Sequence, residues 1–418
     1  MRDVIVIGGG PAGSTTATLL AQQGLSVTLL ERERFPRFQI GESLLPYNND
    51  LFNRLGVTDE IAESECVPKY GAYFVTADGQ TGYSFRFDQR LQDPYRRSFQ
   101  VKRAEFDHLL LRNAEKQGVV VRQETGVATI DLSDPNVATV RTVHGETLEA
   151  RFVVDGSGHG SVVGSKVGDR GEVESLKKIA FFAHYRNVPR AEGKDGGSTI
   201  IVVLKNAWFW LIPVTQDVMS VGLVVDREHF RQCGLQPEEL LNQTIAASPW
   251  VAERMKNAER VTQVYARKDF SFRMRNIAGS NYVLVGDAAG FLDPIFSTGV
   301  FMAMKSADLA ASAVLERLRT GSMRALNDYQ REISRGFDKY LRFIERFYDR
   351  EFLEVFLQPS ERWGLLEAVV GVLAGDIFSN RNNRMKLAIF FALVQLQKRL
   401  GTIAPRIAWD ALPAAASA

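Results

Sequence analysis

Residues 4–31 read VIVIGGGPAGSTTATLLAQQGLSVTLLE, and this stretch decides the fold. Val4–Ile7 is a short β-branched run, which is typical of a buried parallel strand. The run leads directly into a G-x-G-x-x-G pattern formed by Gly8, Gly10 and Gly13. This order predicts a strand that turns into a helix in the way a nucleotide-binding unit requires.

The residues that follow agree with a nucleotide site. A helix is predicted over Ser14–Gln23, with Gly24 ending it, and a second strand ends at Glu31. The glycines let the backbone approach a pyrophosphate, and the helix N-terminus offers free N–H groups to its phosphates. Glu31 lies 18 residues beyond Gly13, close to the spacing of a carboxylate that accepts hydrogen bonds from ribose hydroxyls.

The composition is that of an ordinary globular protein, with 45% hydrophobic and 24% charged residues. The 418 residues predict two or three domains, and a net charge of +2 does not indicate a nucleic-acid surface. Cys66 and Cys233 lie far apart and form no disulfide framework, which fits a reducing compartment. The five histidines form no close ligand pair, so no metal site is expected. With neither a secretory signal nor a membrane-length apolar stretch, a cytoplasmic protein without a transmembrane segment is predicted.

Three later segments decide between FAD and NAD. Residues 100–111 read QVKRAEFDHLLL and contain Arg103, residues 282–294 read YVLVGDAAGFLDP and contain Asp287, and Asp155 lies between them. In this order they resemble the later FAD motifs of flavoprotein monooxygenases with the p-hydroxybenzoate hydroxylase-like fold. The resemblance implies that Arg103 lies near the FAD phosphates and Asp287 near the ribityl chain. Taken singly, Arg103 could equally form a surface salt bridge, and Asp155 and Asp287 could equally be aspartates of turns. No second glycine motif follows a strand, so a stable NAD(P)H site is not predicted.

The predicted fold class is α/β, with a Rossmann-like FAD-binding domain, an antiparallel-sheet substrate domain and a helical C-terminal region. The predicted boundaries are 1–72, 100–170 and 275–330 for the discontinuous FAD-binding domain, 73–99 and 171–274 for the substrate domain, and 331–418 for the C-terminal region. The aromatic-rich residues 337–356 either line a substrate pocket or pack against the flavin domain, and packing is the favoured interpretation.

Residues 208–213 read WFWLIP, an unusual concentration of aromatic rings. In a strand, Trp208 and Trp210 would point to one face and Phe209 to the other, and core packing alone would explain them. On an FAD framework, however, the segment matches W-x-W-x-I-P, a motif that resembles the flavin-dependent halogenases. The matching positions are Trp208, Trp210, Ile212 and Pro213.

Two more signatures agree with this resemblance. Residues 291–299 read FLDPIFSTG and fit F-x-x-P-x-x-S-x-G, and Lys69 in PKYGA lies where these halogenases keep a lysine. The matching positions of the first signature are Phe291, Pro294, Ser297 and Gly299. Residues 35–46, FPRFQIGESLLP, are shared with reductases of the geranylgeranyl type and discriminate little.

The resemblance implies an FADH2- and O2-dependent halogenase in natural-product biosynthesis that forms hypohalous acid at the flavin. Halide would bind the amides of Thr298 and Gly299, and Trp208 and Trp210 would keep organic substrate and water away from the flavin. Lys69 would either hydrogen-bond the oxidant as an ammonium or form a haloamine as a neutral amine, and the sequence leaves both open. The implied cofactor-binding residues are Gly8, Gly10, Ala12, Gly13, Glu31, Arg32, Ser43, Arg103 and Asp287.

One departure from the family concerns the substrate. Tryptophan halogenases carry a glutamate just before the serine of the S-T-G turn, where this chain has Phe296. The sequence is therefore more similar to the phenol and pyrrole halogenases. The implied partners are a separate flavin reductase, chloride or bromide, and a small aromatic substrate that is free or tethered to an acyl or peptidyl carrier protein.

Two alternatives remain at this point. An aromatic hydroxylase or a prenyl-chain reductase of the same fold would oxidise NAD(P)H rapidly by itself. A non-catalytic FAD-binding partner would have no activity to lose when Lys69 is replaced.

Overall fold

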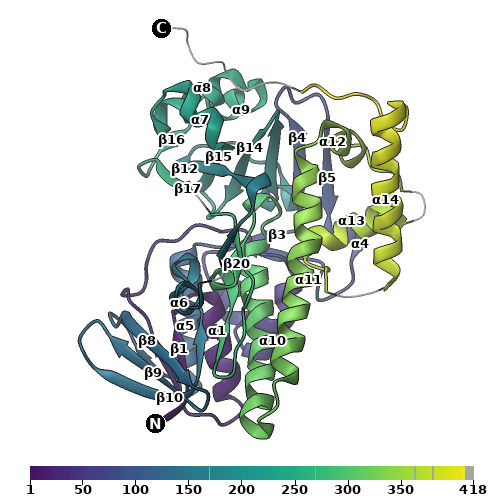
Figure 1. Cartoon of the computed structure of the whole chain (residues 1–418). Coiled ribbons are helices and arrows are strands. Elements are labelled where there is room, and N and C mark those ends of the chain that lie inside the picture. Colours follow the sequence, from purple (N-terminus) through teal and green to yellow (C-terminus); the bar gives the residue numbers. More distant parts are fainter. Residues whose placement is uncertain (169, 269, 362–363, 379–380, 410–418) are drawn as a thin grey trace.

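Two large β-sheets organise the molecule, and they lie toward opposite ends of it (Figure 1). The computed structural model describes residues 1–409 except 169, 269, 362–363 and 379–380. Residues 410–418 of the predicted C-terminal region therefore lie outside the described part, and the domain boundaries themselves stay a prediction.

The first sheet has seven strands in the order β7-β2-β1-β10-β9-β8, with β19 also paired to β10. Its strands are β1 (Arg2–Ile7), β2 (Val27–Leu30), β7 (Val120–Arg122), β8 (Val127–Asp134), β9 (Val137–Thr142), β10 (Thr147–Asp155) and β19 (Tyr282–Leu284). The pairs of β1 with β2 and β10, of β2 with β7 and of β10 with β19 are parallel. Three helices pack beside one another on this part, namely α1 (Pro11–Ala21), α5 (Arg103–Lys116) and α10 (Thr298–Thr320). The predicted α/β class with a Rossmann-like unit is confirmed.

The second sheet has eight strands in the order β16-β12-β15-β14-β13-β4-β5, with β17 also paired to β12. They are β4 (Gly71–Thr76), β5 (Gly82–Arg86), β12 (Lys178–Arg186), β13 (Thr199–Leu204), β14 (Ala207–Pro213), β15 (Val218–Asp226), β16 (Glu259–Arg260) and β17 (Tyr265–Lys268). The predicted antiparallel arrangement holds except for the pair β4–β13, which is parallel. The chain leaves this sheet after β5 and returns only at β12, so β4 and β13 are not joined by a hairpin.

Side chains of the second sheet alternate between two cores. Trp208 and Trp210 belong to the large core that continues into the first sheet, whereas Phe209 belongs to a smaller core on the other face. The smaller core is covered by α8 (Pro237–Ala247) and α9 (Pro249–Met255), with α7 (Arg227–Cys233) nearby. The predicted alternation of this strand is confirmed.

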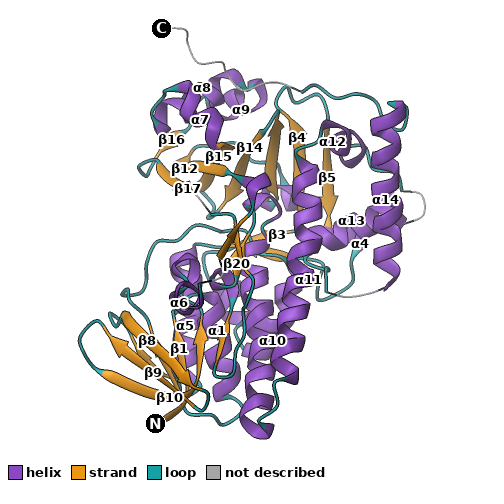
Figure 2. Ribbon diagram, in the orientation of Figure 1, coloured by secondary structure: helices purple, strands orange, loops and turns teal. Residues whose placement is uncertain are grey.

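Short elements connect the two sheets, and four helices follow α10 (Figure 2). The short helices are α2 (Asn49–Leu55), α3 (Thr58–Glu63), α4 (Phe87–Arg90) and α6 (Val162–Val167); the short strands are β3 (Val67–Lys69), β6 (Ser98–Gln100), β11 (Arg170–Glu172), β18 (Phe272–Met274) and β20 (Gly290–Phe291). The later helices are α11 (Arg324–Phe347), α12 (Arg350–Phe356), α13 (Leu365–Ala374) and α14 (Arg381–Leu400). Helix α11 runs beside α10 and continues toward the second sheet, so the C-terminal helices reach both ends of the molecule (Figure 1). None of the described helices combines the length and the hydropathy that a membrane span requires.

Candidate active site

The conformation of the glycine loop between β1 and α1 requires residues without a Cβ atom. Gly8 has a φ of +98°, and a Cβ there would lie 2.4 Å from the carbonyl oxygen of Gly156. A Cβ on Gly13 would lie 1.9 Å from the carbonyl oxygen of Gly8, so the helix can approach the strand only with glycine at this position. No side chain caps α1 at Gly10, which leaves the first turn around Ala12 available to an anion. This cradle fits the pyrophosphate of FAD.

Glu31 follows the second strand and is buried beside the loop. Its carboxylate accepts hydrogen bonds from the backbone N–H groups of Gly9 at 2.6 Å and Glu33 at 2.8 Å. These bonds fix the carboxylate, and its remaining lone pairs can accept from a ribose hydroxyl. Arg32, in contrast, is exposed and pairs with Glu33 at 3.4 Å, so its role toward the cofactor stays a prediction.

Residues 33–45, called the strap below, lead from the first sheet toward Lys69 and are anchored by Arg103. The Nη1 of Arg103 donates to the carbonyl oxygens of Ile40 at 2.7 Å and Gly41 at 3.3 Å. Its Nε and Nη2 donate to the Asp107 carboxylate at 2.8 and 3.0 Å. Burial alone would lower the pKa of Arg103, but Asp107 keeps it above the ordinary value. A permanently charged guanidinium therefore fixes the strap.

The two aspartates of the later motifs differ in their surroundings. Asp287 is partly exposed, with its Oδ2 3.2 Å from Nδ1 of His159, and it acts electrostatically on Arg103. Asp155 is fully buried, and its carboxylate accepts from the backbone N–H of Val163 at 2.7 Å as well as from Ser157. Asp155 therefore holds a turn, whereas Asp287 remains open to a cofactor.

Lys69 ends β3 and is 2% exposed. Its Nζ donates to Oγ of Ser43 at 2.8 Å and to the carbonyl oxygen of Leu44 at 3.1 Å, and Oγ of Ser43 lies 2.9 Å from Oγ1 of Thr199. The ring of Phe87 lies 5.7 Å from the nitrogen. No carboxylate of a described residue forms an ion pair with Lys69, and burial lowers its pKa to about 7. Two acceptors meet the two N–H groups of a neutral amine, whose lone pair is then free.

The tryptophans of the W-x-W-x-I-P motif are held rigidly in β14. Trp208 and Trp210 are 1% and 5% exposed, and Nε1 of Trp210 donates to Oγ of Ser220 at 3.1 Å. The Trp210 ring lies flat over the neighbouring strand at Gly222, where a Cβ would be 2.2 Å from the ring. The other two motif positions are Ile212 and Pro213, at the end of the same strand. These contacts fix two buried indole rings side by side in the large core.

The S-T-G turn lies between a short 3-10 helix that begins at Pro294 and the long helix α10. Ser297 adopts the left-handed conformation with a φ of +56°, and α10 begins at Thr298 without a side-chain cap. Gly299 leaves room for the ring of Phe291, which would lie 3.1 Å from a Cβ at this position. The first turn of α10 therefore presents backbone N–H groups that can bind an anion.

A buried hydrogen-bonded chain, missed by the sequence reasoning, joins the two motifs. Nε1 of Trp208 donates to Oη of Tyr348 at 3.0 Å, and that hydroxyl donates to Oδ2 of Asp293 at 2.9 Å. Asp293 also accepts from the backbone N–H of Ile295 at 3.0 Å, and burial raises its pKa to about 6. Nζ of Lys178 lies 3.7 Å from the centre of the Tyr348 ring. Asp293 occupies a variable position of the F-x-x-P-x-x-S-x-G motif, and Tyr348 is one of many aromatic residues in 337–356. Neither residue could therefore be singled out from the sequence.

Phe296 fills the position where tryptophan halogenases carry an acid. Its ring packs against Phe74, Phe343 and Phe347, with centroid distances of 6.5, 6.4 and 5.8 Å. Two of these rings come from α11, as expected if the aromatic stretch packs rather than forming an open pocket. The surroundings of Phe296 are therefore apolar and aromatic.

A second contact that the sequence reasoning missed ties the strap to the second sheet. Oε1 of Glu42 lies 2.7 Å from Nε2 of His184 on β12, and both side chains are largely buried. Ser43, the next residue, reaches Lys69. The strap thus brings together Arg103, Lys69 and the second sheet, which are distant in sequence.

Comparison with known proteins gives one consistent result. The family model described as tryptophan halogenase matches residues 3–95 and 80–352. The chain is 30% identical over 406 residues to the 1H-pyrrole-2-carbonyl peptidyl-carrier-protein chlorinase of Pseudomonas fluorescens, a match that covers 91% of this chain and 90% of that protein. The structure resembles the myxobacterial chondrochloren halogenase, described as an FAD-dependent halogenase, with a TM-score of 0.79 and 33% identity over 94% of this chain and 97% of that one. It also resembles a flavoprotein/dehydrogenase from Cytophaga hutchinsonii, with a TM-score of 0.86 and 30% identity over 95% and 99% of the two chains.

Proposed function

The chain belongs to the tryptophan halogenase family and is a flavin-dependent halogenase, and we propose that it halogenates an electron-rich ring, a phenol or a pyrrole, in natural-product biosynthesis. The observation that carries the proposal is Lys69, a buried lysine that contacts the end of the strap and forms no ion pair with any carboxylate in the described part of the chain. Phe296 supports the choice of ring, because an apolar side chain stands where an indole enzyme has its acid.

The residues around the glycine loop fit FAD. Gly8, Gly10 and Gly13 leave room for the pyrophosphate, Glu31 would accept from the ribose, and Asp287 would meet the ribityl chain. When bound and reduced by a separate flavin reductase, FAD would supply, with oxygen, the oxidising power for converting halide into hypohalous acid. Arg103 would act by holding the strap beside the cofactor.

The proposed halide site is the first turn of α10. The amides of Thr298 and Gly299 would bind chloride or bromide, because the turn is uncapped and the helix dipole favours an anion there. Trp208 and Trp210, which are buried, would keep water and organic substrate away from the flavin.

Lys69 is the proposed catalytic residue, and it acts as a neutral amine. Its two N–H groups are engaged by Ser43 and Leu44, which directs the lone pair elsewhere. The amine nitrogen attacks the halogen of hypohalous acid, and the halogen–oxygen bond breaks. The released hydroxide takes a proton from the nitrogen and leaves as water, so that a haloamine remains on Lys69. The ring carbon then takes the halogen and loses a proton, which restores the amine. Halogenation is expected to speed up as the pH rises through about 7, since the amine form becomes more populated.

The test is a mass-spectrometric assay with purified protein, FAD, an unrelated flavin reductase, NADH, oxygen and bromide. The panel contains free phenols, together with pyrrole-2-carbonyl and tyrosyl groups as pantetheine and carrier-protein thioesters. We expect a product with the bromine isotope doublet that Lys69→Met abolishes while FAD binding is retained. A product heavier by one oxygen would assign the protein to the hydroxylases, and undiminished bromination by Lys69→Met would remove the lysine from the mechanism.

A further inference from the structure

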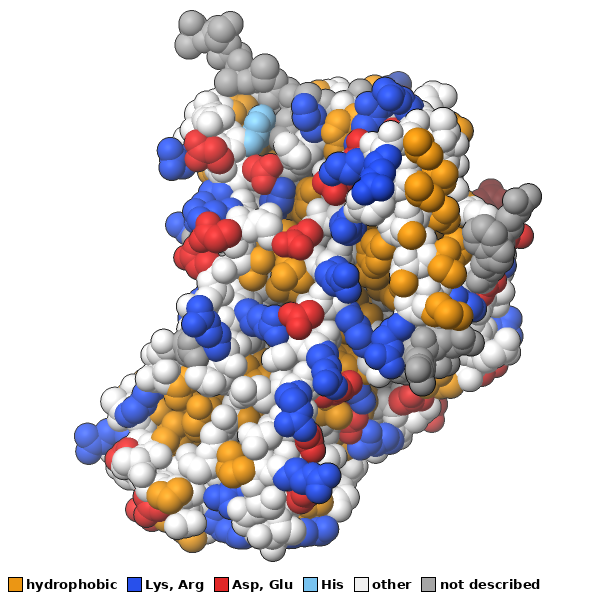
Figure 3. Space-filling view, turned by 45° about the vertical axis from the view of Figure 1, so that its right-hand side comes forward, with side chains coloured by type: hydrophobic (Ala, Val, Ile, Leu, Met, Phe, Trp, Pro, Cys, Tyr) orange, Lys and Arg blue, Asp and Glu red, His pale blue; other side chains and the backbone are white. Residues whose placement is uncertain are grey.

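Helix α14 carries an apolar stripe on its outward face. Met385, Leu396 and Leu400 are 62%, 41% and 62% exposed, and two exposed alanines lie between them. The stripe consists of Met385, Ala388, Ala392, Leu396 and Leu400. Their spacing of three or four residues places them on one side of the helix. Figure 3 shows hydrophobic side chains gathered over this part of the surface, with basic side chains beside them.

The charges of α14 all have one sign. The helix contains five lysines and arginines and neither aspartate nor glutamate, as the sequence RNNRMKLAIFFALVQLQKRL shows. The basic residues are Arg381, Arg384, Lys386, Lys398 and Arg399. A basic helix with an apolar face is suited to an acidic amphipathic partner.

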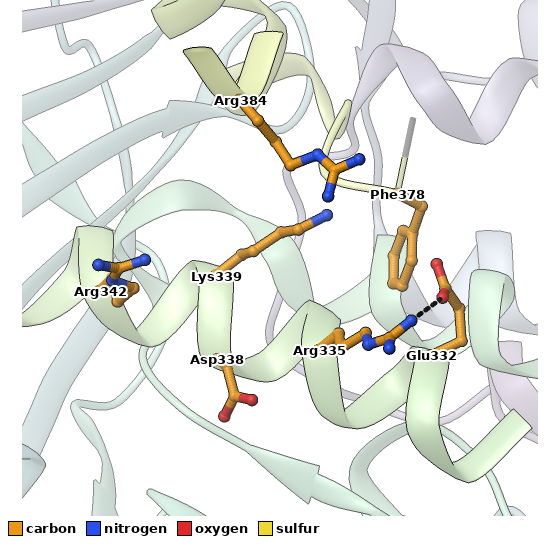
Figure 4. Close-up of a pocket in the computed structure, with 7 residues that line it drawn as sticks. All are labelled: Glu332, Arg335, Asp338, Lys339, Arg342, Phe378 and Arg384. Atoms are coloured by element: carbon orange, nitrogen blue, oxygen red, sulfur yellow. Dashed lines mark ion pairs between the residues drawn. The ribbon is translucent and has the colours of Figure 1, made fainter. Parts of the chain in front are cut away.

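A pocket of about 480 Å³ opens between α11 and α14, next to Met385 (Figure 4). It is lined by Glu332, Arg335, Asp338, Lys339, Arg342, Phe378 and Arg384. The two acids are already engaged, because Glu332 lies 4.0 Å from Arg335 and Asp338 pairs with Arg273 at 2.6 Å. The lining thus keeps a surplus of positive charge.

Two of the four cations that line this pocket point toward one another. Lys339 and Arg384 converge from the two helices (Figure 4), and burial together with the nearby Arg384 and Arg335 lowers the pKa of Lys339. Within the described residues, neither Arg342 nor Arg384 forms an ion pair. An anion with several oxygens, such as a phosphate diester, would relieve this repulsion.

Phe378, one of the pocket-lining residues, packs against the start of α10. The ring of Phe378 lies 6.1 Å from that of Phe301, which is three residues beyond Thr298 on α10. Gly336 makes room for this ring, because a Cβ there would be 2.6 Å from Phe378. One aromatic contact, that of Phe378 with Phe301, therefore connects the pocket lining to the first turn of α10.

We infer that the α14 stripe and this pocket dock an acidic carrier protein, with the phosphate of its phosphopantetheine arm in the pocket and an acidic helix along α14. The inference rests on the proposed function, since it names the partner that delivers the ring. The chlorinase relative acts on a pyrrole-2-carbonyl group of a peptidyl carrier protein, which is a partner of this chemistry.

A second copy of this chain fits the surface poorly. Two copies of α14 would bring like charges together across the stripe. The helix has 20 residues and is about 30 Å long, so the contact is small for a permanent dimer. A small, charged contact suits a carrier that must dock and leave in every reaction cycle.

The experiment measures binding and turnover with the same variant. The probe is the pyrrole-2-carbonyl peptidyl carrier protein of Pseudomonas fluorescens, fluorescently labelled for binding, and a pyrrole-2-carbonyl pantetheine thioester serves as the carrier-free substrate. The variant is Arg342→Glu with Arg384→Glu. The control, Arg141→Glu with Arg319→Glu, makes the same charge change at exposed arginines on β9 and α10.

We expect the α11/α14 variant to weaken carrier binding about tenfold or more, with a lower kcat/KM on the tethered ring and an unchanged kcat/KM on the thioester. The control should behave as wild type. Equal carrier affinity in variant and wild type would overturn the docking site. Binding of wild type to phosphatidylserine vesicles but not to the carrier would also overturn it, as would self-association that the variant abolishes.

Failure of the proposed function has a different signature. If wild type binds the carrier through these arginines but halogenates neither substrate, the docking site stands and the substrate assignment fails. If wild type halogenates the thioester but does not bind the carrier, the substrate stands and the docking site fails.

Discussion

The glycine loop and the surroundings of Lys69 are both buried, but they are built in opposite ways. The loop works through side chains that are absent, because Gly8 and Gly13 let backbone segments approach where a Cβ would collide. The Lys69 region instead depends on large buried side chains, namely an amine that forms no ion pair with a described carboxylate and two indole rings tilted by 49° to one another. A sterically required glycine can be read from a short local pattern, whereas a buried amine acquires its character only from segments that fold around it.

The largest effect on stability is expected when a side chain is added to the glycine loop. Gly13→Ala places a methyl group 1.9 Å from the carbonyl oxygen of Gly8, so α1 must move away from β1. We expect a loss of about 3 kcal/mol or more in the free energy of unfolding, together with loss of FAD binding. Urea unfolding and FAD titration measure the two effects.

Gly160→Ala is the control for this variant. Gly160 ends a short 3-10 helix that begins at Gly158, does not adopt a left-handed φ and has no atom within 4 Å of an added Cβ. Its stability should stay close to wild type. Equal stability of the two variants would mean that the loop relaxes freely and that the glycine pattern is not a steric requirement.

The second effect concerns the cost of keeping Lys69 without a counter-charge. Its folded pKa of about 7 lies below the ordinary value of 10.5, so between these values the unfolded chain binds the proton more tightly than the folded one. The folded state therefore gains stability from this group as the pH rises through that window, and is penalised below it. Removing the amine by Lys69→Met should raise stability more at pH 7 than at pH 9, by about 2–3 kcal/mol.

Denaturant unfolding of Lys69→Met and wild type at the two pH values measures this difference. Lys256→Met removes an exposed lysine and should give the same change at both. A pH-independent effect of Lys69→Met would mean that Lys69 remains charged when folded, and the ammonium role would then replace the amine. If Lys69→Met loses halogenation and gains stability, the buried amine destabilises the fold and is retained for its catalytic role.

Sequence alone predicted the strand, glycine turn, helix and second strand of residues 4–31, because the pattern that specifies them is local. The surroundings of Lys69 were different, since Ser43 and Thr199 are 156 positions apart and meet only in the folded chain. The resemblance to known halogenases pointed to Lys69, but nothing local predicted its burial, its two acceptors or its lowered pKa. The parallel pair β4–β13 was missed for the same reason, because strand order between distant segments leaves no trace in either segment.

The smallest effect on stability is expected at Tyr348, which tests the region that is assembled from distant segments. Its hydroxyl links Trp208 of β14 to Asp293 of the F-x-x-P-x-x-S-x-G motif. Its hydroxyl accepts from Trp208, 140 positions away, and donates to Asp293 in the loop before the halide turn. Tyr348→Phe removes both bonds and leaves a buried indole N–H and a buried carboxylate oxygen each without this partner. The expected loss is about 1–3 kcal/mol in the free energy of unfolding, measured with urea.

Tyr185→Phe, on β12 of the second sheet, provides the control. The Tyr185 hydroxyl is buried and has no hydrogen-bond partner among the described residues, so its removal should be neutral or slightly stabilising. A loss confined to Tyr348→Phe would assign the stability to the two hydrogen bonds rather than to the aromatic ring. Equal effects would reduce Tyr348 to one more packed ring of residues 337–356. If instead halogenation falls in Tyr348→Phe more than stability does, the hydroxyl acts by positioning Asp293 and the turn that follows it, and the C-terminal helices become part of the active site rather than its cover.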